Sequence, residues 1–254
     1  MITIKTPEEI AKMRQAGQMV ARVLSILEAT VKPGVTTARL NAIAEDECKS
    51  HGAIPAFKNY PNYKGGRAFP GVICASVNDE VVHGIPGDRA LKEGDIISID
   101  FGVLLNGFAG DSAITVPVGE VDSKVMKLIE VTEESLMKGI QEARAGNRLG
   151  MVSHAVQNHA EKNGLSVVRQ FVGHGIGRNM HEDPPVPNYG KPDRGPVLKQ
   201  GMTLAIEPML NMGTYKVDTK SDEWTVVTCD GGFSAHFEHS IVIGDRGPEI
   251  LTLR

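Results

Sequence analysis

The sequence is poor in cysteine, and no run of apolar residues approaches the length that a membrane span needs. Cys48, Cys74 and Cys229 are odd in number and lack the paired spacing of a structural zinc site. The first six residues contain no apolar core of a signal peptide. We therefore expect a soluble cytoplasmic protein that does not bind a membrane. Each cysteine, taken alone, is expected to be a small core residue rather than a nucleophile.

An excess of positive charge is also absent. The chain carries 27 Lys and Arg residues against 31 Asp and Glu, which gives a net charge of −4 and a pI near 6.1. A dedicated nucleic-acid-binding protein normally presents a basic face, so we expect no direct function on DNA or RNA. Flexible linkers and low-complexity tails are missing, and 41% of the residues are apolar. The chain can therefore bury a large core.

A short motif occurs twice in the chain. Residues 91–100 read Leu-Lys-Glu-Gly-Asp-Ile-Ile-Ser-Ile-Asp, and residues 198–207 read Leu-Lys-Gln-Gly-Met-Thr-Leu-Ala-Ile-Glu. Each copy is a glycine turn followed by a short apolar run, which is typical of a buried strand, and each run ends in a carboxylate. A carboxylate at the end of a buried strand is costly unless a positive group meets it.

The surroundings of the two copies repeat as well. His83 and His174 each begin a His-Gly-Ile run upstream of the motif. Asp111 and Glu238 each precede a short apolar segment downstream of it. The order histidine, acid, acid thus occurs twice, which indicates an internal duplication.

The predicted helices support the same duplication. Capping residues and helical spacing predict a first helix from Thr6 to about Thr30, a second from Thr36 or Thr37 to Gly52, a third from Asp122, and a fourth from after Gly146 to Gly164. Gly34 to Gly52 and Gly146 to Gly164 both span 18 positions (52 − 34 and 164 − 146). We therefore expect two related halves, about 1–120 and 121–254, that share one core.

The segments between the helices predict loops and strands. Residues 55–71 are rich in Pro, Gly and aromatic residues, so we expect a surface loop that leads into a strand near 72–77. Residues 181–190 are too rich in proline for a central strand and are expected to wall a cleft. A hairpin is expected from Trp224 to Ile243, with its turn at residues 230–232. The order of elements predicts an α+β fold with antiparallel strands in the middle and helices outside.

Four acids, Asp100, Asp111, Glu207 and Glu238, recur at matching positions of the two halves. For any one of them a salt bridge or a cap would be the simpler explanation. Packing the halves face to face would bring all four into one pocket, where they repel one another unless cations neutralise them. Two divalent ions balance four negative charges, and oxygen-rich coordination with an imidazole suits Mn, Fe, Co or Zn. The pattern therefore predicts a catalytic site with two divalent metal ions per chain.

The histidines leave alternatives open. His83 and His174 are equivalent in the repeat, so the residues alone do not decide whether one or both bind metal. His181 stands in the proline-rich segment, where an unpaired histidine is commonly just exposed to solvent. His236 alternates onto the strand face of Glu238 and is expected to border the pocket.

The acids and histidines lie within longer recognisable runs. These runs are residues 171–185 (Phe-Val-Gly-His-Gly-Ile-Gly-Arg-Asn-Met-His-Glu-Asp-Pro-Pro), Ile99-Asp100 with Gly107-Phe-Ala-Gly-Asp111, Ala205-Ile-Glu-Pro208 and Phe237-Glu-His239. Together they resemble the type I methionine aminopeptidases, and the likeness covers nearly the whole chain. The resemblance implies a pita-bread fold, in which two pseudo-symmetric halves share a central sheet covered by helices. It also implies a single catalytic domain over residues 1–254.

The same resemblance implies the roles of the metal-site residues. Asp111 and Glu238 bridge two ions, Asp100 completes the coordination of one ion, and His174 with Glu207 completes the other. A hydroxide between the ions attacks the carbonyl of the N-terminal methionine, with a metal as Lewis acid on that oxygen.

The resemblance further implies how the substrate is held. His181 hydrogen-bonds the developing oxyanion, His83 faces the scissile amide nitrogen, and Glu207 carries the proton. The methionine side chain is expected in an apolar pocket that includes Phe69, Cys74 and Trp224.

The expected partners are the N-termini of peptides and nascent chains whose second residue is small. The resemblance implies a monomer that associates transiently with the ribosome. The chain departs from the family at Met180, where an aromatic is frequent, and at His236, where Gln is common. It has no large insertion between His174 and Glu207, which favours type I over type II.

Two other functions fit parts of the pattern. Xaa-Pro aminopeptidases share the fold, but they usually carry an added N-terminal domain for which 254 residues leave no room. A pita-bread binding module that has lost catalysis and recognises peptides would lack metal ligands, whereas all five are present. Metal content and peptide hydrolysis would separate these alternatives.

Overall fold

The helices begin and end close to the predicted positions. In this computed structural model the described residues are 1–62 and 65–254, so residues 63 and 64 of the predicted surface loop lie outside them. Over the described ranges the helices are α1 (Pro7–Thr30), α2 (Thr37–His51), α3 (Ser123–Glu142) and α4 (Leu149–Lys162). No helix in that part of the chain is both long and apolar enough to cross a membrane.

Local side-chain chemistry explains the helix ends. The Thr6 hydroxyl accepts a hydrogen bond from the Glu9 backbone N–H, and the Glu9 carboxylate accepts one from the Thr6 backbone N–H. Side-chain oxygens of Thr36 and Asp122 likewise accept backbone N–H groups at the starts of α2 and α3. Gly52 ends α2 in the left-handed conformation, at a φ of 65°. These caps are confirmed.

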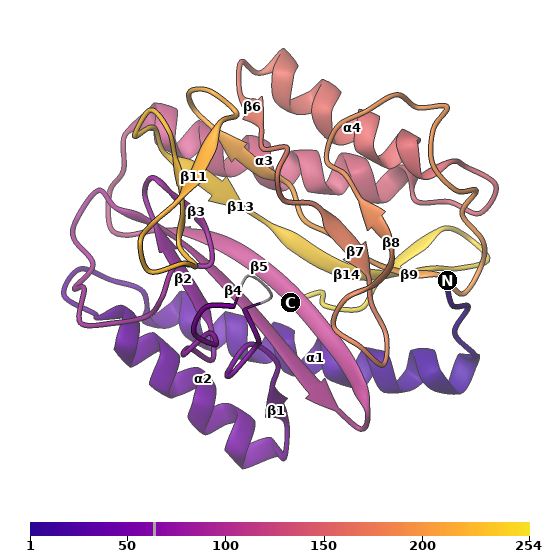
Figure 1. Cartoon of the computed structure of the whole chain (residues 1–254), viewed down its shortest axis with the longest axis horizontal. Helices are drawn as coiled ribbons and strands as arrows, with labels where there is room; N and C mark the ends of the chain where they lie inside the picture. Colours follow the sequence, from indigo (N-terminus) through magenta and orange to yellow (C-terminus); the bar gives the residue numbers. More distant parts are fainter. Residues whose placement is uncertain (63–64) are drawn as a thin grey trace.

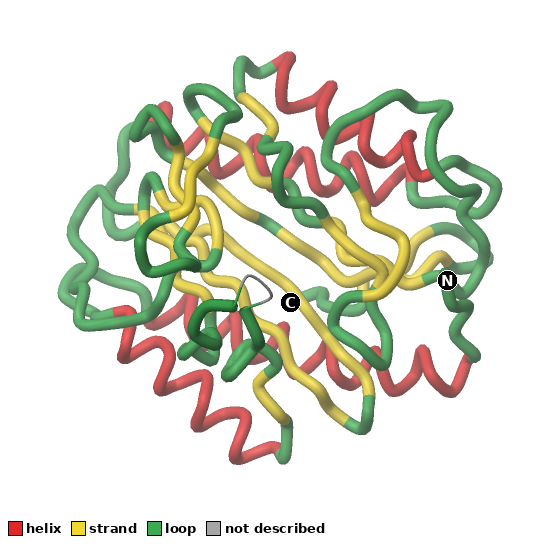
Figure 2. The backbone as a smooth tube through the Cα atoms, in the orientation of Figure 1, coloured by secondary structure: helices red, strands yellow, loops and turns green. Residues whose placement is uncertain are grey.

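An antiparallel sheet occupies the middle of the molecule. Its strands are β1 (Ile54–Pro55), β2 (Cys74–Val77), β4 (Ile96–Leu105), β5 (Phe108–Pro117), β7 (Gly173–Gly175), β8 (Glu182–Val186), β9 (Thr203–Ile206), β14 (Glu238–Ile243) and β15 (Pro248–Ile250). They follow the order β1-β4-β5-β14-β9-β7-β8, with β2 paired to β4 and β15 paired to β14. In the view of Figure 1, α1 and α2 run below these strands and α3 and α4 run above them. Figure 2 shows the same arrangement, with the strands in yellow between the red helices.

Two small sheets flank the main one. Their strands are β3 (Glu80–Val82), β6 (Ser166–Val167), β10 (Met209–Asn211), β11 (Val217–Thr219), β12 (Val226–Thr228) and β13 (Ser234–His236). The predicted hairpin over residues 224–243 is wrong, because β12 pairs with β11 and β3 whereas β13 pairs with β10. A distant turn binds both strands: Thr228 N–H donates to the Asp79 carbonyl and Ser234 N–H donates to the Asn78 carbonyl, each at 2.9 Å. Because of these long-range hydrogen bonds, β12 and β13 do not pair with each other across the predicted turn at residues 230–232.

The two motif copies differ in the position of their acid. β9 stops just before Glu207, where Pro208 lacks the N–H that would continue the ladder. β4 runs on past Asp100, so the expectation that each acid ends its strand is wrong for this copy. The second half of β4 pairs with β5 across a tight turn at Asn106 and Gly107, whose φ angles are 53° and 78°.

Small residues let α1 approach the centre of the sheet. A side chain added at Gly110 of β5 would come 2.7 Å from the backbone of Ala16 in α1. β5 also pairs with β14, and this ladder connects strands from the N-terminal and C-terminal halves. The largest buried apolar cluster draws its residues from both halves.

Candidate metal centre and adjoining cavity

The strand register brings three carboxylates to one face of the sheet. Asp100 of β4 lies opposite Ala113 of β5, and Glu238 of β14 lies opposite Ala113 from the other side. Asp111 precedes Ala113 by two residues, so its side chain points to the same face. The three acids therefore converge from neighbouring strands.

His174 and Glu207 reach this face from the next two strands. His174 of β7 lies opposite Ala205 of β9. Glu207 follows Ala205 by two residues and therefore shares its face, and the β9–β14 register sets Glu207 beside Glu238. The strands thus present all five predicted ligands side by side.

The side-chain atoms of this cluster are close enough to share cations. One ligand atom from each of Asp111, His174 and Glu238 lies within 4.8 Å of the others. His174 Nε2 lies 3.8 Å from Asp111 Oδ2 and 3.7 Å from Glu207 Oε1. His174 Nδ1 lies 2.9 Å from the Gly175 carbonyl oxygen. Because a carbonyl only accepts, Nδ1 carries the proton, and the lone pair of Nε2 faces the carboxylates.

Burial makes the four acids hard to ionise. It raises the pKa of Asp100 to about 7 and the pKa of Glu207 to about 8. Burial, and then the neighbouring carboxylates, raise the pKa of Asp111 and of Glu238 as well. Among the described residues, Asp100 Oδ1, Asp111 Oδ1 and Glu238 Oε1 are buried oxygens without a hydrogen-bond donor. Such acceptors are costly to bury alone, and carboxylates with one imidazole fit a divalent cation.

The histidines around the acids are neutral at pH 7. Burial, reinforced by neighbouring histidines, lowers the pKa of His83 and of His174 to about 4. Burial also lowers the pKa of His181. Each ring therefore has one nitrogen that donates and one that accepts or binds a metal.

A cavity of about 510 Å³ opens beside the acids. It brings together all ten residues to which the sequence assigns a site role: Phe69, Cys74, His83, Asp100, Asp111, His174, His181, Glu207, Trp224 and Glu238. The Phe69 and Trp224 rings meet edge to face at 5.2 Å, and Cys74 lies opposite Asp100 in the β2–β4 ladder. His83 stands edge-on to the Phe171 ring at 5.4 Å. The cavity is therefore lined by both acidic and apolar side chains.

Several cavity residues received no role from the sequence: Phe57, Tyr60, Pro61, Asn62, Phe171, Thr219, Glu223 and Val226. The hydroxyl of Tyr60 lies 2.8 Å from His181 Nδ1. The aromatic residues of the proline-rich loop 55–71 were the available signal for this contact. Thr219 and Val226 lie on β11 and β12, whose pairing does not follow from the local sequence.

His236 borders the acids without lining the cavity. Its ring is buried, and its Nε2 lies 3.6 Å from Glu207 Oε2. The Thr115 hydroxyl donates to the His236 carbonyl and accepts from the His236 N–H, which fixes the backbone of β13 against β5. The position agrees with the expectation that His236 borders the pocket.

Comparison with known proteins assigns the family. Residues 11–245 match the profile of metallopeptidase family M24. The methionine aminopeptidase of Clostridium acetobutylicum is 56% identical to this chain over 254 residues, which cover 100% of this chain and 99% of that protein. This chain belongs to the methionine aminopeptidases of family M24. Membership of a metallopeptidase family agrees with a centre that binds divalent metal.

Solved structures show how far the likeness extends. The crystal structure of methionine aminopeptidase from Thermotoga maritima has a TM-score of 0.96 and 47% identity, and the match covers 100% of both chains. Xaa-Pro dipeptidase from Bacillus anthracis has a TM-score of 0.76 at 20% identity, over 98% of this chain and 61% of that one. The second likeness shows a shared fold alone. The pita-bread fold expected for a methionine aminopeptidase is confirmed.

Proposed function

We propose that this chain removes the N-terminal methionine from peptides and nascent proteins whose second residue is small. One observation carries the proposal: four carboxylates and the Nε2 lone pair of His174 converge on a cavity that is also lined by aromatic side chains. The relatives at high identity, which are methionine aminopeptidases, support the same reaction.

The acids would hold two divalent ions, drawn from Co, Mn, Fe and Zn. Asp111 and Glu238, from the two central strands, would be shared between the ions. Asp100 would complete one site, and His174 with Glu207 would complete the other. The buried carboxylate oxygens that lack donors would then have partners. When bound, the ions supply Lewis acidity toward the substrate carbonyl and lower the pKa of water.

His181 would stabilise the negative charge that develops on the methionyl carbonyl oxygen. The Tyr60 hydroxyl lies 2.8 Å from His181 Nδ1, and by donating to that nitrogen it would keep the ring proton on Nε2. Burial lowers the pKa of His181 and favours the neutral ring, whose Nε2–H would then be the donor to the substrate. Tyr60 would thereby select the tautomer that can serve the substrate.

His83 and Glu207 would act on the leaving side of the bond. His83 would face the scissile amide nitrogen from the wall that it forms with Phe171 and Trp224. Glu207, which lies beside His174 and His236, would carry a proton toward the departing amine. The methionine side chain would pack against the rings of Phe69 and Trp224, since a thioether makes favourable contacts with aromatic rings.

Metal content and the hydrolysis of two peptides test the proposal. Protein purified without added metal should hold two divalent ions, which anomalous X-ray scattering identifies, and should cleave Met-Ala-Ser but not Ala-Pro-Ala. Cleavage of Ala-Pro-Ala alone would instead favour a proline-specific peptidase. A chain that binds no metal and cleaves neither peptide would be a binding module, and the proposal would fail.

A further inference from the structure

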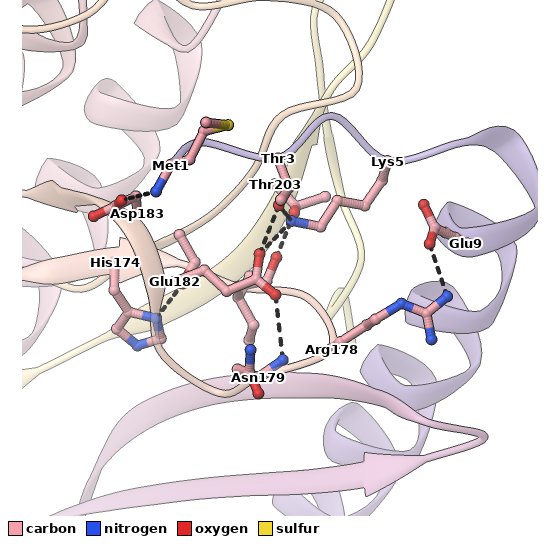
Figure 3. Close-up of polar contacts among 12 residues, drawn as sticks. Met1, Thr3, Lys5, Glu9, His174, Arg178, Asn179, Glu182, Asp183 and Thr203 are labelled. Atoms are coloured by element: carbon pink, nitrogen blue, oxygen red, sulfur yellow. Dashed lines mark hydrogen bonds and ion pairs between the residues drawn. The ribbon is translucent and has the colours of Figure 1, made fainter.

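The turn that carries His181 is tied to the N-terminal segment of the chain. β7 and β8 form a hairpin, and His181 lies at the end of its connection. Glu182 begins β8 and points away from His181, because successive side chains of a strand alternate between its faces. Figure 3 shows the Glu182 carboxylate meeting the side chain of Lys5, which arrives from the segment before α1.

Lys5 and Glu182 form an almost fully buried ion pair. Lys5 Nζ lies 2.5 Å from Glu182 Oε2, and the two side chains are only 5% and 12% exposed. The Thr3 hydroxyl donates to the same oxygen at 2.8 Å, and the Asn179 backbone N–H donates to Oε1 at 3.2 Å. Burial raises the pKa of Glu182, but hydrogen bonds from Lys5, Thr3 and Asn179 outweigh it and hold this pKa below its usual value. The carboxylate therefore stays ionised inside the protein.

Lys5 is itself fixed to the body of the molecule. Its backbone N–H donates to the Gly201 carbonyl at 2.9 Å, in the turn before β9. A side chain added at Gly177 would come 2.5 Å from Lys5 Cε and 2.6 Å from Glu182 Oε1, so the ion pair packs directly on the His181 turn. The pair thus joins the start of α1, the approach to β9 and the hairpin connection.

The same turn has a second ion pair of a different kind. Arg178 Nη2 lies 3.0 Å from Glu9 Oε1, but the Arg178 side chain is 66% exposed. An exposed pair is screened by water and constrains geometry weakly, whereas a buried carboxylate that loses its partner must move or take up a proton. Lys5 therefore controls the conformation of the turn more strongly than Glu9 does.

We propose that Lys5 is a positioning residue for the peptidase reaction, acting through Glu182 on the orientation of His181. This inference rests on the proposed role of His181 as the oxyanion donor. The His181 ring centroid lies 4.3 Å from that of His174, and its Nδ1 lies 2.8 Å from the Tyr60 hydroxyl. A displacement of about 1 Å in a catalytic group can cost about 10²-fold in rate, so release of the turn lowers kcat more than it changes KM.

The variant Lys5→Met removes the ammonium group and keeps an unbranched apolar side chain. We expect kcat on Met-Ala-Ser to fall about 10- to 100-fold, with KM changed by less than about threefold and metal content unchanged. Arg14→Ala is the control, since it removes an exposed ion pair between α1 and Glu249 and should leave kcat within about twofold. A folded Lys5→Met protein with the wild-type kcat would overturn the proposal, and so would loss of its metal, which would assign the effect to His174.

Two double variants test the route through Glu182 and His181. Lys5→Met with Glu182→Gln leaves no unpaired buried charge to displace the turn, so we expect thermal stability and kcat both to recover toward the wild-type values. A kcat as low as that of Lys5→Met in this protein would overturn the proposal. In a His181→Ala background, Lys5→Met should cause no further loss, because the residue through which it acts is gone. A full additional loss would overturn the proposal. Wild-type protein that does not cleave Met-Ala-Ser would overturn the proposed function and this inference together.

Discussion

Ser240 holds the backbone of Asp111 at both its N–H and its carbonyl group. The Ser240 hydroxyl lies 3.1 Å from the Asp111 backbone nitrogen and donates to the Asp111 carbonyl at 2.7 Å. The carboxylate at the end of this fixed backbone keeps one oxygen, Oδ1, without a donor. A carboxylate on a fixed backbone, with an unused acceptor, suits a cation shared with a neighbouring acid.

We predict that Asp111→Asn loses both metal and activity. The amide removes the negative charge that attracts a cation and replaces one carboxylate oxygen with an NH2 group, which cannot coordinate metal. Because loss of a ligand's supporting partner alone costs about 10–100-fold, loss of Asp111 should lower kcat/KM on Met-Ala-Ser by more than about 10²-fold. Metal analysis of the purified variant and steady-state kinetics measure both effects. Asp88→Asn, at an exposed position, is the matched control. Undiminished cleavage by Asp111→Asn would contradict the proposed mechanism.

Acidic residues within apolar strand segments could be recognised from the sequence as candidates for the site. Asp100 and Glu207 drew attention because acids rarely end or interrupt apolar strands, and their repetition made metal the simplest explanation. The Lys5–Glu182 pair could not be found in this way. Its two partners are 177 positions apart, and no local pattern in either segment links one to the other.

At the scale of elements, the helix starts could be predicted from nearby residues, whereas the pairing of strands could not. The starts of α1, α2 and α3 followed from capping residues, because a cap depends on four or five neighbouring positions. The partners of β12 and β13 did not follow from the sequence, since each strand bonds to residues far along the chain. Only the periodicity of a strand is local, whereas its place in a sheet is not.

Gly102 of β4 has no side chain and so leaves room for the Asp111 carboxylate of the proposed metal centre. Gly102 lies opposite Asp111, and an added Cβ would come 3.0 Å from Asp111 Oδ1 and 2.6 Å from Met180 Cε. We predict that Gly102→Ala weakens metal binding by about 10-fold or more, because it crowds a ligand oxygen. The fold should remain, since the flexible end of Met180 can shift.

Calorimetric titration with Mn²⁺ or Co²⁺ measures the effect of Gly102→Ala, with circular dichroism as the check on folding. Gly87→Ala is the control, because an added Cβ at that position meets nothing within 4 Å. If Gly102→Ala bound metal with the wild-type affinity, the added Cβ would not crowd the Asp111 carboxylate, and the prediction would be wrong.

At the scale of the whole molecule, the buried charges make stability depend on pH. Burial raises the pKa of Asp100 to about 7 and of Glu207 to about 8, so the metal-free folded state binds protons that the unfolded chain has released. Their contribution to stability is present at low pH and is lost as pH rises through these values. His83 and His174, with pKa values lowered to about 4, act in the opposite direction, but mainly below pH 6.5.

We therefore predict that the free energy of unfolding of the metal-free protein falls between about pH 6.5 and pH 8, by roughly 1–2 kcal/mol. Urea titrations in the presence of a chelator measure it. With excess Mn²⁺ the trend should reverse, because the ligands bind metal only when they are deprotonated. Rising stability of the metal-free protein over this interval would contradict the assignment of protonated acids.

The final prediction concerns the two halves, about 1–120 and 121–254. β5 pairs with β14 across the proposed boundary, and β12 of the second half pairs with β3 of the first. Neither half can therefore satisfy its strands or bury its share of the common core alone, and separate fragments should remain largely unfolded. Trp224, the single tryptophan, packs on Phe69 of the other half, so its fluorescence reports contact between the halves. In urea, tryptophan fluorescence and far-UV circular dichroism should give one coincident transition. Two separated transitions, or a folded fragment 1–120, would divide the chain into independent domains.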